Sequence, residues 1–313
     1  MSLSREEKTK KTSIPKYATF IISGIAASGA VIFCHPIDVI KNRMQLSGEG
    51  GAKKVHKSSF HAVTNIISRD GPLALYDGFS ANIARQLCYT MTRLSVFQLL
   101  IDKFKTSGYE GLKPQIAASL TAGFVASLIA TPTDVILVRM TADRRLALNE
   151  QRQYKHVLDA FLRIRKEEGI VNLWAGVIPT VLRALVGNVT QLVTYVQAKS
   201  FLLSKEYMKD GIGVHFLASL ASGLIYAFST TPIDVAKTRL QMMKRTSGVP
   251  AYKGLADVWT KTIKNEGVTA LWKGFIPYYL KIAPNTVLLF IFVEQLNRMY
   301  KVYVMKDSNA KGL

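Results

Sequence analysis

The sequence predicts an all-α membrane protein with six transmembrane helices, arranged as three repeats that each carry a short amphipathic helix. Three observations support this prediction: one unit recurs three times, six apolar stretches are long enough to cross a bilayer, and basic residues are sorted between alternate loops. The chain has 313 residues, 49% of them hydrophobic, and is therefore too apolar for a disordered protein.

One unit of sequence recurs at a period near 98 residues. The segment PIDVIKNRMQ at Pro36 returns as PTDVILVRMT at Pro132 and as PIDVAKTRLQ at Pro232. Recurrence at a fixed period is the signature of a repeat architecture. We therefore predict one transmembrane domain of three repeats between two tails, and the predicted boundaries are 1–16, 17–111, 112–211, 212–303 and 304–313.

Each repeat contains two apolar stretches, separated by a basic loop with a short amphipathic helix. A helix needs about 20 residues to cross the apolar core of a bilayer. All six stretches reach that length, and they run over 17–46, 80–101, 113–141, 177–203, 214–243 and 275–302.

The basic residues are unevenly distributed over the loops. The loops within the repeats hold 17 of the 41 Lys and Arg residues, whereas the two linkers between repeats hold 6. This is the asymmetry of positive-inside topology, and six spans place both termini on the other face of the membrane. A soluble helical repeat has no reason to sort its bases in this way. The formal net charge of +20 indicates an anionic partner.

Several classes of protein are not supported by the sequence. Cys34 and Cys88 form no disulfide framework or zinc motif, and no metal-ligand spacing appears elsewhere. No nucleophile–base motif indicates an enzyme. The segment SGEGGAKK lacks the ending of a phosphate-binding loop, and the N-terminus shows no secretory signal. We therefore predict a non-enzyme without metal or cofactor.

Each repeat places a proline and an aspartate inside its first apolar stretch. Proline lacks an N–H and clashes with the preceding turn, so it kinks the helix, and three bent helices can converge at one end. The prolines are Pro36, Pro132 and Pro232, the aspartates are Asp38, Asp134 and Asp234, and the next turn carries Lys41, Leu137 and Lys237. His35, beside the first proline, is interpreted either as a proton-sensitive neighbour of the aspartate or as a packed imidazole.

The aspartates are expected to form a ring of ion pairs between repeats. Charges inside a membrane-spanning bundle are costly unless they are paired or wetted. The expected pairs are Asp134 with Lys237 and Asp234 with Lys41. The third link would join Asp38 to Leu137 and is expected to be vacant. Such a ring can form and break, as a gate must.

The second apolar stretch of each repeat carries a basic residue at one common depth. These residues are Arg85, Arg183 and Lys281, each seven positions after a glycine. Arg85, Tyr89 and Arg93 share one helix face, and Asn188 is either a further polar contact or a helix–helix hydrogen bond. The alternative for the three cations is snorkelling to the membrane interface. Unneutralised at one level, they are expected to bind a small diacid.

At these residues the chain resembles the mitochondrial carrier family, whose proline–acid–base signature is complete in repeats one and three and lacks its first base in repeat two. The resemblance implies six tilted helices around a pseudo-three-fold axis in the mitochondrial inner membrane, with the amphipathic helices on the matrix side and both termini in the intermembrane space. It implies that the aspartate ring is a matrix gate braced by Gln45 and Gln241, with Thr141 departing from the pattern.

The resemblance also implies a cytoplasmic gate near the ends of the second helices. Its motif survives only in part here, at Gln98, Lys199 and Glu294, so we expect closure by hydrogen bonds and apolar contacts. Gly71, Gly169 and Gly267 are expected to border sites for a structural lipid, cardiolipin, although Asp77 and Ala175 replace the usual base.

The function implied by the resemblance is antiport of small dicarboxylates by alternating access, with 2-oxoglutarate and malate as the expected pair. The chain is expected to act as a monomer, without nucleic acid. Dicarboxylate/phosphate exchange and proton leak remain open, since the same cations attract any small anion. A basic helical scaffold that binds partner proteins or nucleic acid is the alternative from another class.

Overall fold

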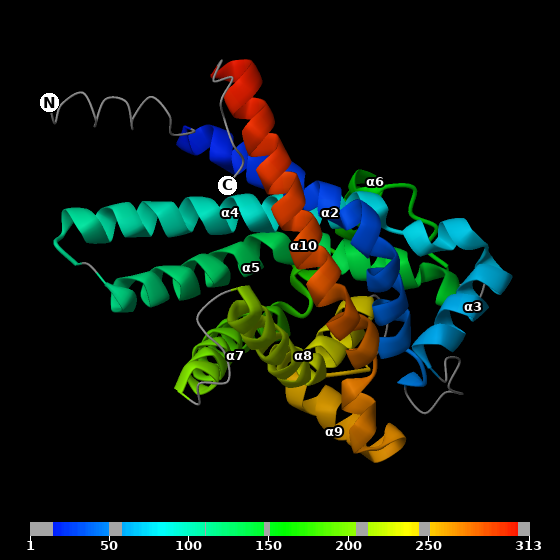
Figure 1. The fold of residues 1–313 in the computed structure, drawn as a ribbon. Helices are drawn as coiled ribbons and strands as arrows, with labels where there is room; N and C mark the ends of the chain where they lie inside the picture. Colours follow the sequence, from blue (N-terminus) through cyan, green and yellow to red (C-terminus); the bar gives the residue numbers. More distant parts are fainter. Residues whose placement is uncertain are drawn as a thin grey trace, which may run out of the picture.

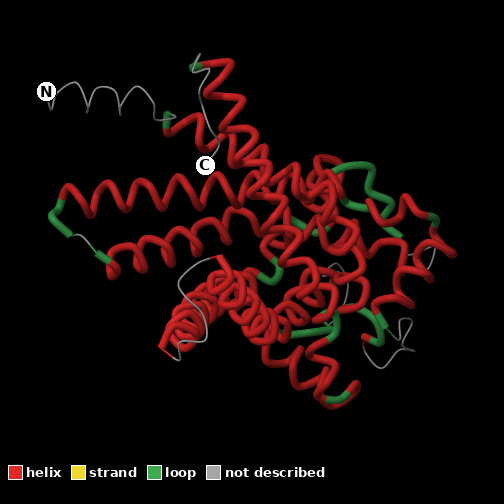
Figure 2. The backbone as a smooth tube through the Cα atoms, viewed as in Figure 1, coloured by secondary structure: helices red, strands yellow, loops and turns green. Residues whose placement is uncertain are grey.

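The computed structural model describes residues 15–49, 58–109, 111–146, 151–204, 212–243 and 251–305, and these form helices joined by short loops (Figures 1 and 2). Six of the helices are long. They are α2 (Lys16–Gln45), α4 (Phe79–Thr106), α5 (Leu112–Ala142), α7 (Val177–Ser204), α8 (Ile212–Met242) and α10 (Phe275–Met299), the last continued by the π-helical turn η6 (Tyr300–Val304). The six predicted apolar stretches therefore correspond to six helices.

The six long helices form a closed bundle in chain order. Each contacts its successor, from α2 through α4, α5, α7 and α8 to α10, and α10 packs back against α2. Figure 1 shows α4 and α5 running side by side, and α10 crossing α2. At one end of the bundle the hydroxyl oxygens of Tyr17 and Tyr300 lie 3.5 Å apart. The arrangement surrounds a central axis toward which all three repeats contribute side chains.

The predicted prolines lie inside the first long helix of each repeat. Pro36 is in α2, Pro132 in α5 and Pro232 in α8. In Figure 1, α2 changes direction along its length, as expected where proline removes a backbone hydrogen bond.

Three short amphipathic helices lie at the other end of the bundle. They are α3 (Ser59–Asp70), α6 (Val157–Glu167) and α9 (Leu255–Glu266), followed by the 3₁₀ helices η2 (Pro72–Tyr76), η4 (Ile170–Trp174) and η5 (Val268–Trp272). Another 3₁₀ turn, η3 (Asp143–Arg145), follows α5. Each short helix buries residues four apart against its own repeat, as Ala160 and Ile164 do beside Ile136.

Four described segments are long and apolar enough to cross a membrane. They are Tyr17–Gln45, Lys113–Arg145, Ile170–Ser204 and Val268–Val304, which include α2, α5, α7 and α10. Helices α4 and α8 have comparable lengths, 28 and 31 residues, and complete the closed bundle.

Candidate functional site

The first long helices of the three repeats meet through ion pairs between their aspartates and lysines. Lys41 Nζ lies 2.7 Å from Asp234 Oδ2, and Lys237 Nζ lies 2.8 Å from Asp134 Oδ2. These are the two pairs that three-fold symmetry predicts. We call Asp38, Asp134 and Asp234, together with the basic residues that contact them, the aspartate ring.

A belt of three arginines, each five residues after a ring aspartate, joins each repeat to the next. Arg43 Nε donates to the carbonyl oxygen of Thr141 at 3.1 Å, and Arg139 Nε donates to that of Gln241 at 3.0 Å. Arg239 Nε closes the circle on the carbonyl oxygen of Gln45 at 3.4 Å. The belt was not predicted from the sequence, although each of its members stands seven residues after the proline of its repeat.

Each belt arginine also pairs with the acidic residue before the glycine of its own repeat. Arg239 makes two hydrogen bonds to Glu266, of 2.6 and 2.8 Å, and Arg139 makes the same pair to Glu168. Burial raises the pKa of the Glu266 carboxyl, but hydrogen bonds from Arg239 and Lys273 outweigh burial and hold the pKa below its ordinary value. These forked pairs fix the short helices against the bundle.

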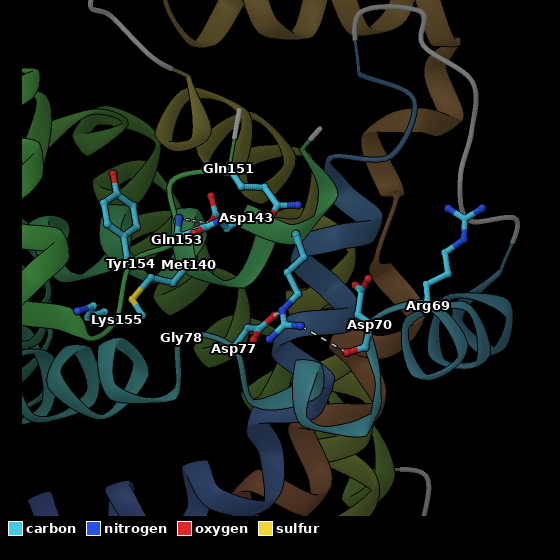
Figure 3. Close-up of a pocket in the computed structure, with 11 residues that line it drawn as sticks. Arg69, Asp70, Asp77, Gly78, Met140, Asp143, Gln151, Gln153, Tyr154 and Lys155 are labelled. Carbon is cyan, nitrogen blue, oxygen red and sulfur yellow. Dashed lines mark hydrogen bonds and ion pairs between the residues drawn. The ribbon is translucent and has the colours of Figure 1, made fainter. Parts of the chain in front are cut away.

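The corresponding pairs in the first repeat differ because Asp77 stands where the third repeat has Lys273. Arg43 contacts both Asp70 and Asp77, and Arg144 Nε lies 2.9 Å from Asp77 Oδ2. Burial outweighs these two arginines and raises the pKa of Asp77. The surrounding pocket has a volume of about 490 Å³. In Figure 3, Asp70 and Asp77 lie on one side of it, and Asp143 accepts a hydrogen bond from the backbone N–H of Gln153.

The residues predicted to brace the ring lie directly beneath it. The side-chain oxygen of Gln45 accepts a 2.7 Å hydrogen bond from Thr238 Oγ1. A Cβ added to Gly274, whose φ is +83°, would lie 3.2 Å from Gln45 Cγ, so this glycine allows close packing. Gln241 is fully buried, and within the described chain its amide atoms have no hydrogen-bond partner. Thr141, the departure from the pattern, accepts from Asn42 Nδ2 at 3.1 Å.

The three cations of the second helices all point toward the aspartate ring. Lys281 Nζ lies 2.6 Å from Asp38 Oδ1, Arg183 Nε lies 2.5 Å from Asp234 Oδ1, and Arg85 Nε lies 3.5 Å from Asp134 Oδ1. The expectation that these cations are unneutralised was therefore wrong. At Asp38, Leu137 supplies no base from the second repeat, as expected, but Lys281 of α10 pairs with the acid. The physical reason is depth, because the cations lie within one side chain's reach of the acids, and buried charges pair where a partner is near.

The ring and the three cations line one cavity of about 90 Å³. The charged residues of its lining are Asp38, Asp134, Asp234, Lys41, Lys237, Arg85, Arg183 and Lys281. Five cations and three carboxylates leave an excess of two positive charges at the centre of the bundle. The excess that the sequence predicted is present, although it is smaller and shared.

Two tyrosines that sequence analysis overlooked hold Arg183. Arg183 Nη2 donates to Tyr278 Oη at 2.8 Å and lies 3.4 Å from Tyr226 Oη. Lys41 Nζ stands 3.7 Å above the Tyr278 ring, which is a cation–π geometry. The sequence feature that could have identified these tyrosines is that neither is repeated. The other repeats have Asn82 and Thr180 at the position of Tyr278, and Ala30 and Ala126 at the position of Tyr226.

The ring of Tyr226 fits against Gly187 of the neighbouring helix. A Cβ added to Gly187 would lie 2.5 Å from Tyr226 Cε2, closer than side chains tolerate. Gly187 occupies the position equivalent to Tyr89 in the first repeat. The missing side chain on α7 is therefore what admits the tyrosine from α8.

Asp38 has a neutral neighbour in place of a second base. Asn82 Nδ2 donates to Asp38 Oδ2 at 3.0 Å and lies 2.9 Å from His35 Nδ1. His35 Nε2 lies 3.0 Å from the carbonyl oxygen of Asp77, so the ring donates from Nε2 and accepts at Nδ1. His35 is fully buried with both nitrogens engaged, which matches the interpretation as a packed imidazole.

The remaining predicted contacts do not line the central cavity of the described chain. Tyr89 is half-buried and Arg93 is exposed on α4. Asn188 Nδ2 lies against Gly123 of α5, where a Cβ would stand 3.3 Å away, but it has no hydrogen-bond partner among the described residues, so the helix–helix hydrogen bond is not formed in this structure. Any role for these three residues in binding stays a prediction.

The other predicted sites are placed by the structure without being tested by it. Gln98 and Lys199 are half-buried and Glu294 is exposed, toward the C-terminal parts of α4, α7 and α10. Gly71, Gly169 and Gly267 have φ values of +82°, +88° and +88°, and a Cβ added to any of them would meet open space.

Comparison with known proteins covers nearly the whole chain. The mitochondrial carrier protein family profile matches residues 12–108, 112–206 and 209–303. A Caenorhabditis elegans protein named mitochondrial 2-oxoglutarate/malate carrier protein is 47% identical over 303 residues, covering 96% of this chain and 98% of its own. The Homo sapiens protein of that name is 45% identical over 296 residues, covering 93% and 94%.

A relative with a different name is less similar. Mitochondrial uncoupling protein 5 of Arabidopsis thaliana is 37% identical over 306 residues, covering 91% of this chain and 98% of its own. Three matched repeats, the closed six-helix bundle and the aspartate ring agree, and the chain belongs to the mitochondrial carrier family.

Proposed function

We propose that this protein exchanges small dicarboxylates, 2-oxoglutarate for malate, across the mitochondrial inner membrane by alternating access. The observation that carries the proposal is the central cavity, where five cations face three carboxylates. A diacid with two negative charges matches that excess of two positive charges. The relatives named 2-oxoglutarate/malate carrier, aligned over more than nine-tenths of this chain, support the choice of substrate.

A substrate carboxylate can compete with the ring aspartates for the arginines that pair with them. Arg85 and Arg183 each share an aspartate with a lysine, and their guanidinium forks are suited to a carboxylate. A diacid that enters from the end away from the ring draws these cations from their aspartates. The ring weakens, and the end that it closes can open.

The excess charge also explains why exchange is expected rather than one-way transport. Two uncompensated cations in a low-dielectric centre are unfavourable, and separation of the ring pairs would expose further unpaired charge. A bound diacid removes that penalty. The loaded protein therefore changes state more readily than the empty one, so export of one diacid requires import of another.

The finer parts of the proposal concern orientation, lipid and assembly. We propose that α3, α6 and α9 face the matrix and that both termini lie in the intermembrane space, and the excess of basic residues in the loops within repeats supports this orientation. The aspartate ring is then the matrix gate, and Gln98, Lys199 and Glu294 belong to a weaker cytoplasmic gate.

We further propose that cardiolipin binds near Gly71, Gly169 and Gly267, and that a single chain is sufficient for transport. Lipid analysis and mass measurement of the purified protein test these two points.

Counter-exchange in liposomes tests the function. Protein is reconstituted with labelled 2-oxoglutarate inside, and malate, succinate, citrate, phosphate or aspartate is added outside. We expect external malate to release the label fastest, and phosphate and aspartate to release little. Release driven equally by phosphate would favour dicarboxylate/phosphate exchange, and no release by any diacid would reject the proposal. Alkaline extraction separates the scaffold alternative, because a scaffold would leave the membrane.

A further inference from the structure

Asp38 is the one ring aspartate that contacts a single cation among the described residues. Asp234 has Lys41 at 2.7 Å and Arg183 at 2.5 Å. Asp134 likewise has one lysine and one arginine. Asp38 has Lys281 at 2.6 Å, and its other side-chain hydrogen-bond partner among the described residues, Asn82, is neutral.

The missing partner of Asp38 is the base that the second repeat lacks. Leu137 stands where the other repeats have Lys41 and Lys237, lines the same cavity as Asp38, and is 6% exposed. Lys281, on α10, makes the contact with Asp38 that Arg85 makes with Asp134 and Arg183 with Asp234, but at Asp38 no ring lysine shares the acid with it among the described residues.

We propose that Lys281 is the base on which the closed ring depends at Asp38, since Leu137 supplies none, and that a substrate carboxylate opens the ring at Asp38 by drawing Lys281 away. This inference rests on the proposed function and assigns one residue to both the gate and the substrate site. Binding of a diacid to Lys281 would therefore break the ion pair that joins α10 to Asp38 of α2.

The chemistry of lysine suits this double role. Its ammonium is a point charge on a flexible four-carbon stem, so it can leave one carboxylate for another with little rearrangement. Arg183, in contrast, is held by Asp234, Tyr278 and Tyr226 together. Of these two cations, Lys281 has the fewer contacts to break.

The consequences of losing the cation differ around the ring. When a substrate takes an arginine from Asp134 or Asp234, a lysine still neutralises that aspartate. When it takes Lys281, Asp38 keeps only the amide of Asn82, and a buried carboxylate without a cation is strongly unfavourable. The link between α2 and α10 at Asp38 is therefore the first to open.

Restoring the missing base tests the proposal. In Leu137→Lys, a second base shares Asp38 with Lys281, as two cations share Asp134 and Asp234. Asp38 then holds Lys281 less strongly against the substrate, while the ring stays closed when substrate is bound. The KM for 2-oxoglutarate exchange should fall, and the maximal rate should fall too, each by about fivefold or more, the lower end of typical coupling between sites. Leu137→Met reports how much of any change comes from repacking alone.

Asp38→Asn provides an independent variant that leaves the core around Leu137 untouched. It also releases Lys281, so KM should fall, but it removes the link instead of reinforcing it, and the maximal rate should fall less than in Leu137→Lys. The double variant Lys281→Ala with Leu137→Lys should regain the thermal stability that Lys281→Ala loses, without regaining exchange.

Two results would overturn the proposal while wild-type exchange is intact. One is an unchanged KM in both Leu137→Lys and Asp38→Asn. The other is a double variant no more stable than Lys281→Ala alone, since Leu137→Lys would then not replace the ring base. If the wild-type protein failed to exchange 2-oxoglutarate for malate, the proposed function would fail instead, and the two failures are distinguishable.

Discussion

The corners of the aspartate ring at Asp234 and Asp38 occupy equivalent positions in two repeats and are built in opposite ways. At Asp234, a lysine, an arginine and two tyrosines surround the acid and its partners. At Asp38, the only such contacts among the described residues are one flexible lysine and one amide. Repetition therefore supplies a ring that closes, and departures from repetition decide which part is rigid and which part yields.

The largest loss of exchange is expected when Arg183, the cation held rigidly at Asp234, is removed. Arg183→Ala should reduce exchange by at least about 30-fold, because truncating one partner of a buried, hydrogen-bonded charge pair costs about 2–5 kcal/mol. Arg85→Ala should reduce exchange less, because Arg85 lies 3.5 Å from its aspartate and must be ordered when substrate binds. Exchange in liposomes measures both, and thermal unfolding of each variant controls for folding. An equal or larger loss in Arg85→Ala would contradict the contrast.

A smaller effect should follow from crowding Tyr226. Gly187→Ala places a Cβ 2.5 Å from the Tyr226 ring and should lower stability by about 1–3 kcal/mol, with exchange reduced as Tyr226 leaves Arg183. Gly223→Ala is the matched control, because a Cβ there would make an ordinary 3.6 Å contact with Ile282. In a Tyr226→Ala background the stability cost of Gly187→Ala should largely vanish. If the cost persisted there, the crowding would come from another neighbour.

Most of the repeated features could be predicted from the sequence, but the repeated arginine belt and the non-repeated tyrosines were not. Three prolines, six apolar stretches and an aspartate in each repeat were enough to place the helices and to pair Asp134 with Lys237, because symmetry says which repeat supplies each partner. Symmetry does not tell how far along the bundle axis the cations of the second helices lie from the aspartates of the first helices, and a difference of one side chain's length decides whether they pair. The contact between Lys281 and Asp38 therefore could not be predicted from counting along the helices.

The tyrosines show a second limit of the same reasoning. Tyr226 replaces alanine at the equivalent positions, and its site depends on Gly187, which lies on a different helix. A single sequence gives no link between those two residues. The sequence shows that Tyr278 differs from the residues at the equivalent positions of the other repeats. It does not show that Arg183 reaches its hydroxyl, which gives the tyrosine its role.

Removal of one hydroxyl should give a smaller change than either substitution above. Tyr278→Phe deletes the acceptor 2.8 Å from Arg183 Nη2 but keeps the ring beneath Lys41. One such hydrogen bond to a charged group is worth about 1.5–3 kcal/mol, yet Arg183 keeps Asp234, so we expect the lower end, about tenfold in kcat/KM. Tyr226→Phe should cost less, since its hydroxyl is 3.4 Å away. The reverse order would show that Tyr226 is the main support.

The smallest effects are expected outside the membrane-spanning helices, where Glu266 and Asp77 should respond to pH with opposite signs. The pKa of Glu266 is lowered, so its carboxylate stabilises the fold above the ordinary value of 4.5, and that contribution disappears as pH falls through the folded value. The loss of melting temperature in Glu266→Gln should therefore be full at pH 7 and shrink in acid. The pKa of Asp77 is raised, so ionisation disfavours the fold above the ordinary value of 3.8. Asp77→Asn should gain stability relative to wild type as pH rises through that region, measured by thermal unfolding across pH. Parallel pH profiles for the two variants would show that the first and third repeats hold their short helices by the same electrostatics, because only a buried, under-compensated carboxylate at Asp77 reverses the sign.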